Sequence, residues 1–110
     1  MKRYSLKNMR GGWFIGDFEP SILRTKDFEV SVRSYRAGER HDAHYHAIAT
    51  EINVVTEGSV DIDGEIFTSG EIFVVYPMES INPLFTENTT IVCVKTPSVM
   101  GDKYSIGENS

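Results

Sequence analysis

From residue 27 onward the chain is a succession of short β-branched and aromatic runs, separated by glycine, proline and acidic turn residues. No segment keeps the 3.6-residue spacing of apolar side chains that an amphipathic helix requires. This pattern is typical of an all-β sandwich or barrel. We expect strands at residues 28–35, 43–48, 51–56, 59–62, 65–67, 71–76, 82–85 and 90–95.

The clearest turn signal is Asp63-Gly64, which lies between two short apolar runs. A type I′ hairpin turn needs positive φ at both central residues, and Asp-Gly is one of the pairs that adopt it. Gly58 and Gly70 predict two further turns, because glycine accepts positive φ without steric cost.

The length and charge of the chain limit its organisation and its partners. The 110 residues allow one domain, which we divide into a strand or cover segment at 1–26, a barrel at 27–97 and a partly ordered tail at 98–110. The formal charge is −5 with the basic residues scattered, so neither nucleic acid nor an anionic membrane is an expected partner. The N-terminus lacks the apolar core of a signal peptide, and we expect a cytoplasmic location.

Two histidines and a glutamate gather in the run that begins at Gly38 and ends at Gly58. His44 and His46 are two residues apart, so on a strand both imidazoles point to one face, about 6.6 Å apart. Glu51 opens the next run, and a tight connection brings its carboxylate to the same space. Two imidazoles and one carboxylate suit a divalent metal ion, whereas a chance surface pair of histidines leaves Glu51 unexplained.

The same run resembles the first motif of the cupin superfamily: glycine, five residues, His-x-His, three or four residues, glutamate, six residues, glycine. The match covers Gly38, His44, His46, Glu51 and Gly58. The resemblance extends over residues 28–96 and implies a cupin double-stranded β-helix, a small jelly-roll barrel. It also implies that the two histidines and the glutamate hold a metal ion such as Fe, Mn, Ni or Zn.

The second cupin motif is degenerate, which leaves the fourth metal ligand open. Gly70 is followed by Pro77 one residue late, and Glu79, Asn82 and Thr86 replace the motif's glycine, histidine and asparagine. Asn82 through its amide oxygen, Glu79 turned inward, or water are the three alternatives. We favour water or Asn82, because Glu79 falls in an expected turn. A barrel that has lost useful metal affinity is the competing interpretation.

Strand alternation predicts which side chains face outward. In the strand at 28–35, Val30 and Val32 share one face, so we expect Arg33 and Tyr35 to point outward. Arg33 is on this basis a poor candidate for holding an anionic substrate. His41 falls on the side opposite to the two ligand histidines, and we expect it to be exposed.

The strands after residue 50 predict an apolar outer face. If Glu51 points inward, Ile52 and Val54 point outward, and residues 72–76 are apolar on both faces. Either the segment at residues 13–15 or a second subunit covers this face, and we expect a symmetric homodimer. A bulge near Thr50 that buries Ile52 and Val54 is the alternative.

The expected function is to bind, or act on, a small polar molecule at the metal ion, with Asn53 and Asn82 as candidate substrate contacts. The resemblance implies a wide range, since cupins include dioxygenases, isomerases and lyases as well as storage proteins. The alternatives are a non-catalytic module that captures a sugar or carboxylate, with weak or no metal binding, and a structural relic. Cys93, the only cysteine, is expected to be a small core residue.

Overall fold

The computed structural model describes residues 1–106, so the last part of the expected tail, residues 107–110, lies outside the described residues. One 3-10 turn, η1 (Leu6–Asn8), precedes the strands. The strands are β1 (Trp13–Ile15), β2 (Glu29–Tyr35), β3 (His44–Tyr45), β4 (Thr50–Glu57), β5 (Ser59–Ile62), β6 (Glu65–Thr68), β7 (Ile72–Val75), β8 (Ser80–Ile81), β9 (Pro83–Phe85), β10 (Thr89–Thr96) and β11 (Tyr104–Ser105). Within residues 1–106 no helix has the length and apolar character needed to cross a membrane.

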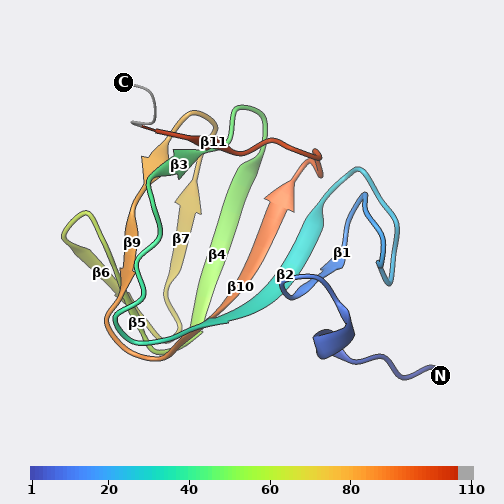
Figure 1. Cartoon of the computed structure of the whole chain (residues 1–110), viewed down its shortest axis with the longest axis horizontal. Helices are drawn as coiled ribbons and strands as arrows, with labels where there is room; N and C mark the ends of the chain where they lie inside the picture. Colours follow the sequence, from blue (N-terminus) through green and yellow to red (C-terminus); the bar gives the residue numbers. More distant parts are fainter. Residues whose placement is uncertain (107–110) are drawn as a thin grey trace.

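The strands form three antiparallel sheets that enclose one interior. The largest has the order β1-β2-β10-β4-β7, and the smaller two have the orders β11-β3-β8 and β6-β5-β9. Figure 1 shows β3 and β11 crossing one end of the large sheet, with β5, β6 and β9 beside its β7 edge. The predicted all-β architecture is confirmed.

The register of β10 with its two neighbours defines the inner face of the large sheet. Cys93 lies opposite Ser31 of β2 and Asn53 of β4, and all three side chains are buried. The apolar core on this face consists of Val55, Val60, Ile62, Phe85 and Ile91. The interior is therefore part apolar core and part polar cavity.

The predicted orientation of β2 is wrong. Arg33 lies opposite Ile91 of the core, and Arg33 and Tyr35 both line the interior cavity. Val30 and Val32 consequently lie on the outer face. Around Val32 that face is covered by apolar residues of the N-terminal segment, including Leu6 of η1, Met9, Phe14 and Ile22.

The expected turns are present. Asp63 and Gly64 have φ values of 53° and 92°, as a type I′ hairpin between β5 and β6 requires. Gly58 and Gly70 have φ values of 96° and 90°, which confirms the other two turns. Four strands are shorter than predicted. β2 and β7 each lose only end residues, whereas β3 is reduced to His44–Tyr45 and the run at 82–85 begins only at Pro83.

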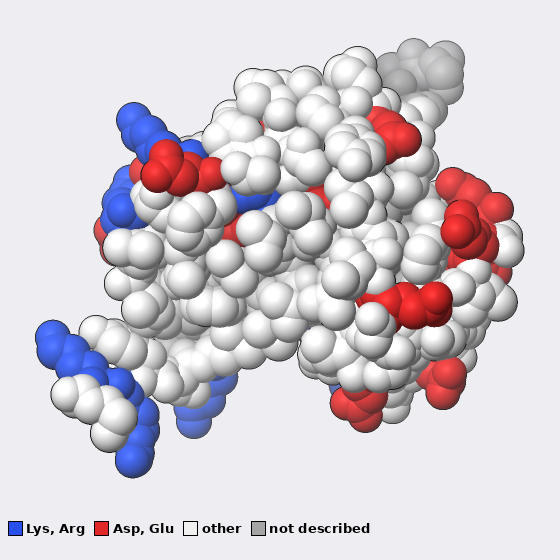
Figure 2. Space-filling model, turned by 180° about the vertical axis from the view of Figure 1, so that it is seen from behind, with Lys and Arg blue, Asp and Glu red and all other residues white. Residues whose placement is uncertain are grey.

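The outer face of β4 and β7 is apolar, as the alternation predicts. Ile52, Ile72 and Val74 are 39%, 61% and 38% exposed, and Ile52 lies opposite Val74 in the register. The alternative of a bulge that buries Ile52 is therefore wrong. Figure 2 views the molecule from behind and shows few charged atoms across the middle of that side.

Candidate metal centre

The structure brings His44, His46 and Glu51 together at one end of the interior. Their ligand atoms all lie within 4.8 Å of one another, and the two imidazole centroids are 5.5 Å apart. His46 Nε2 lies 3.0 Å from Glu51 Oε2. Two atoms that each lie about 2 Å from a tetrahedral ion are roughly 3 Å apart, so this spacing fits a shared metal.

Both histidines are oriented by backbone carbonyl groups. His44 Nδ1 lies 3.1 Å from the carbonyl oxygen of Asp42, and His46 Nδ1 contacts the carbonyl oxygen of Asp102. A carbonyl oxygen only accepts, so each Nδ1 carries the proton and donates it. Nε2 of each ring is then the atom available to an ion, which is how metal-bound histidines are commonly fixed.

Asp102 holds the loop that joins two of the ligands, a role that no motif in the sequence indicates. Its carboxylate accepts hydrogen bonds from the backbone N–H groups of Ala47, Ile48 and Ala49, at 2.9, 3.1 and 2.9 Å. The residue is only 6% exposed. Burial raises the pKa of this carboxyl, but the three N–H donors together lower it by more, so the net shift of the pKa is downward. Asp102 therefore remains ionised and fixes the spacing of His46 and Glu51.

Asn53 positions the glutamate. Its side-chain amide donates to Glu51 Oε1 at 3.0 Å, while the other carboxylate oxygen faces His46. Burial raises the pKa of Glu51, but the hydrogen bonds with His46 and Asn53 outweigh it and the net pKa is lowered. The same bond to Glu51 raises the pKa of His46, whereas burial lowers the pKa of His44. In this pair, a proton on Nε2 of the His46 ring faces the Glu51 carboxylate, and a bound cation would take the place of that proton.

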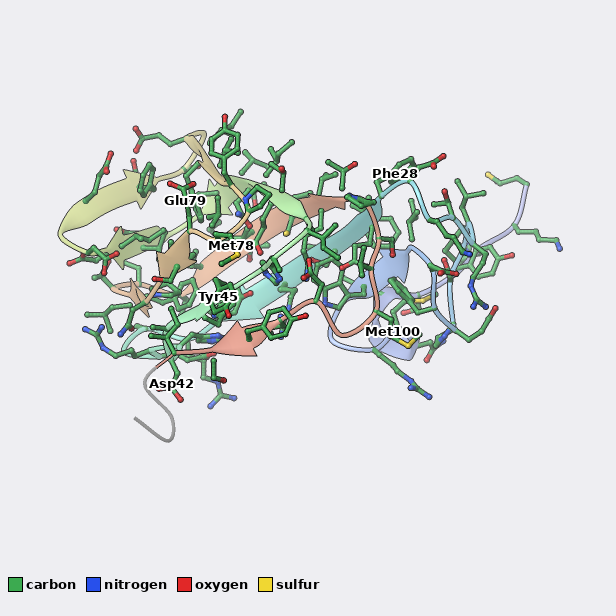
Figure 3. The ribbon with its side chains drawn as sticks, turned by 90° about the horizontal axis from the view of Figure 1, so that it is seen from above. Phe28, Asp42, Tyr45, Met78, Glu79 and Met100 are labelled. Atoms are coloured by element: carbon green, nitrogen blue, oxygen red, sulfur yellow. The ribbon has the colours of Figure 1, made fainter. Side chains whose placement is uncertain are left out.

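Neither protein candidate for the fourth ligand faces the three others. The amide oxygen of Asn82 accepts a hydrogen bond from Arg40 Nη1 at 3.1 Å, and Asn82 is not among the residues that line the cavity. The Glu79 carboxylate accepts the backbone N–H of Tyr76 at 2.7 Å, in the turn that contains Met78. Figure 3 shows Met78 and Glu79 side by side in this turn. Water at the fourth position stays a prediction.

His41 is not exposed on the far side as predicted, because residues 41–43 are not part of β3 and strand alternation does not apply to them. Its ring lines the cavity, 5.1 Å from the Tyr35 ring and 5.5 Å from the Phe85 ring, both edge-on. Its Nε2 lies 2.7 Å from Glu39 Oε2. His41 thus belongs to an aromatic wall of the cavity.

Cys93 lies in the interior as expected, and Tyr45 alternates with the two ligand histidines. Cys93 is buried on the cavity floor, and burial raises the pKa of its thiol far above the ordinary value, which keeps it protonated. Tyr45 points away from the ligands and stacks on Tyr104 of β11 at 5.3 Å (Figure 3). Neither offers a reactive group to the centre.

Solved structures share this architecture. A protein with a double-stranded β-helix domain from Klebsiella pneumoniae superposes with a TM-score of 0.69 at 18% identity, over 94% of this chain and 90% of that one. A cupin-2 domain protein from Shewanella frigidimarina gives 0.56 at 19% identity, over 68% and 76%. The chain has the cupin fold. The predicted jelly-roll barrel is thereby confirmed.

A protein whose structure is described with metal centres is also similar. A Bacillus subtilis oxalate decarboxylase, whose structure is described by its Mn(II) centres, gives a TM-score of 0.62 at 13% identity, over 74% of this chain and 24% of that one. At such identities the likeness establishes the fold alone. No model of a known protein family matches the sequence, and no curated protein matches it significantly.

Proposed function

We propose that this cupin binds a divalent metal ion through His44, His46 and Glu51 and uses it to bind or activate a small polar molecule in the barrel. The observation that carries the proposal is the orientation of the imidazoles. Each Nδ1 donates to a backbone carbonyl, so each Nε2 is available on the side where Glu51 lies. The Mn(II) centres of a protein with the same fold support it.

The ion, when bound, supplies Lewis acidity, or a site for O₂ if it is iron. The chain's own residues hold and shield that position. Asn53 and Asp102 fix the ligands through hydrogen bonds, while Tyr35 and Phe85, stacked at 4.0 Å, form part of the cavity wall. The proposal assigns no reaction type.

Metal analysis of protein purified without a histidine tag tests the proposal. We expect about one ion per chain in the natural protein and under a tenth of that in the double variant His44→Ala/His46→Ala. Circular dichroism is expected to be unchanged, because the apolar core does not include the ligands. The control is His41→Ala, which changes another cavity histidine and should keep its metal.

Two results would contradict this expectation. If the double variant retains its metal, His44 and His46 are not the ligands. Failure of that variant to fold, with His41→Ala folded, would make the ion a structural element of the barrel instead of a functional one.

We also propose that a second copy of the chain covers the outer face of β4 and β7. That face is apolar, nearly uncharged and belongs to a regular sheet, which suits a two-fold contact between identical surfaces. Sedimentation should give about twice the chain mass of 12.4 kDa. We expect Ile72→Lys to give monomers, whereas Ile66→Lys, at a similarly exposed isoleucine on the β5–β6 hairpin, leaves the dimer intact. A monomeric natural protein at micromolar concentration refutes it.

A further inference from the structure

Positive charge is concentrated around the cavity. Three cationic side chains line it, Arg33, Lys95 and Lys103, against the single carboxylate of Glu51. The whole chain has a formal charge of −5, so this local excess of cations is opposite to the overall balance. A bound divalent ion adds to the excess.

Among the residues that the structure describes, one of the three cations has a carboxylate partner. Lys95 Nζ lies 3.3 Å from Glu29 Oε1 and 4.8 Å from the centroid of the Trp13 ring, so it is held within the protein. Across residues 1–106, Arg33 and Lys103 have no carboxylate within 4.0 Å. Their charge is available to a ligand in the cavity.

Arg33 is directed to this position by β2. It lies opposite Ile91, a buried core residue, and therefore on the inner face of the sheet. Its guanidinium carbon is 5.6 Å from the centroid of the Tyr35 ring, two residues further along the same face. Lys103 lines the same cavity as His44 and His46.

Ser31 gives an independent sign of a ligand. Its side chain is 0% exposed and lines the cavity, two residues before Arg33 on the same face. Its hydroxyl is the one buried side-chain polar group in the described part of the chain that has no hydrogen-bond partner. Buried hydroxyl groups are normally paired, so the missing partner points to a polar atom of a bound molecule.

The cavity is small. Its volume of about 90 Å³ is several times the roughly 10–15 Å³ that one water molecule requires, so it takes a molecule of a few non-hydrogen atoms. The planar fork of an arginine matches the two oxygens of a carboxylate. A neutral sugar would leave the charge of Arg33 uncompensated.

We propose that the molecule bound at the metal is a small carboxylate anion, held by the Arg33 guanidinium and the Ser31 hydroxyl. This inference rests on the proposed function, because the ion supplies the other contact. It also replaces the sequence-based view of Arg33 as a poor anion ligand, which depended on the wrong face of β2.

Isothermal titration of the zinc-loaded protein tests the inference with glycolate and its neutral isostere glycolamide. We expect glycolate to bind at least 10-fold more tightly than glycolamide. Arg33→Gln should weaken glycolate binding at least 10-fold. The control Arg36→Gln makes the same charge change just after β2, at an exposed residue outside this cavity, and should stay within twofold.

The outcomes separate this inference from the metal site. If the protein binds zinc but binds glycolate and glycolamide equally tightly, the carboxylate site is wrong and the metal site stands. The same conclusion follows if the two arginine variants weaken glycolate binding equally. Tighter binding of inorganic phosphate than of glycolate overturns the assignment to a carboxylate. If the protein binds none of Zn(II), Mn(II), Fe(II) and Ni(II), the metal proposal fails. The same titrations of metal-free protein then decide the anion site: an Arg33-dependent preference for glycolate supports it, and no preference overturns it.

Discussion

Replacing Asp102 by alanine is expected to lower metal affinity by about 10- to 100-fold, the range typical of residues that position metal ligands. The same change should lower the free energy of unfolding by about 3 kcal/mol, because it removes a charged acceptor and leaves buried N–H donors unpaired. The reason lies in the loop at 47–49, whose three N–H groups all bond to this one carboxylate. Without it, His46 and Glu51 lose their fixed spacing.

Zinc titration and urea unfolding of the purified variant measure the two effects. Asp61→Ala is the matched control, since Asp61 Oδ1 also accepts a backbone N–H, that of Gly64 at 2.8 Å, but in the β5–β6 hairpin. We expect Asp61→Ala to keep its metal affinity and to lose about 1 kcal/mol or less. Equal metal affinity of Asp102→Ala and the natural protein would show that the loop holds its shape without this carboxylate.

The clustering of the three candidate ligands and the hairpin could be predicted because both depend on near neighbours in the sequence. His44, His46 and Glu51 lie within eight residues, and the short loop between β3 and β4, which contains His46, brings them together. The Asp63-Gly64 turn depends only on the φ values of its own two residues. Local geometry of this kind is contained in a single sequence.

The orientation of β2 could not be predicted in the same way. Alternation places the apolar Val30 and Val32 inward only if the interior is apolar throughout. The interior is instead a polar cavity at Ser31 and Arg33, and the N-terminal segment covers Val32 from outside. The prediction thus fails at the residues where we propose that an anion binds, since a face adapted to a ligand breaks the usual apolar pattern.

The role of Asp102 is a long-range contact, and no spacing rule reveals it. The carboxylate binds a loop more than 50 residues earlier in the chain. That loop follows β3, the strand with which β11 pairs. Likewise, the departure of the second motif shows that a ligand is missing but not where Asn82 points. The structure answers this, because Asn82 bonds to Arg40 between the cavity-lining Ile81 and Pro83.

Replacing Gly58 by alanine is expected to destabilise the barrel by about 3 kcal/mol or more, while the same change at Gly38 costs about 1–2 kcal/mol. Both glycines frame the ligand run, and both have positive φ, 96° at Gly58 and 90° at Gly38, which an L side chain adopts only with strain. The difference is in their surroundings. A Cβ at Gly38 meets no atom within 4 Å, whereas one at Gly58 would lie 2.6 Å from Thr89 Cα.

That contact cannot be relieved by rotating a side chain, because the Cβ would also meet the backbone oxygen of Asn88. Thr89 is 2% exposed and accepts the backbone N–H of Ser59 at 3.1 Å, so β10 is tied to the start of β5 at this point. Moving Thr89 would therefore disturb the central strand of the large sheet. Urea unfolding of the two variants measures the difference, and equal losses would show that backbone strain alone, and not packing against Thr89, requires glycine at both ends of the ligand run.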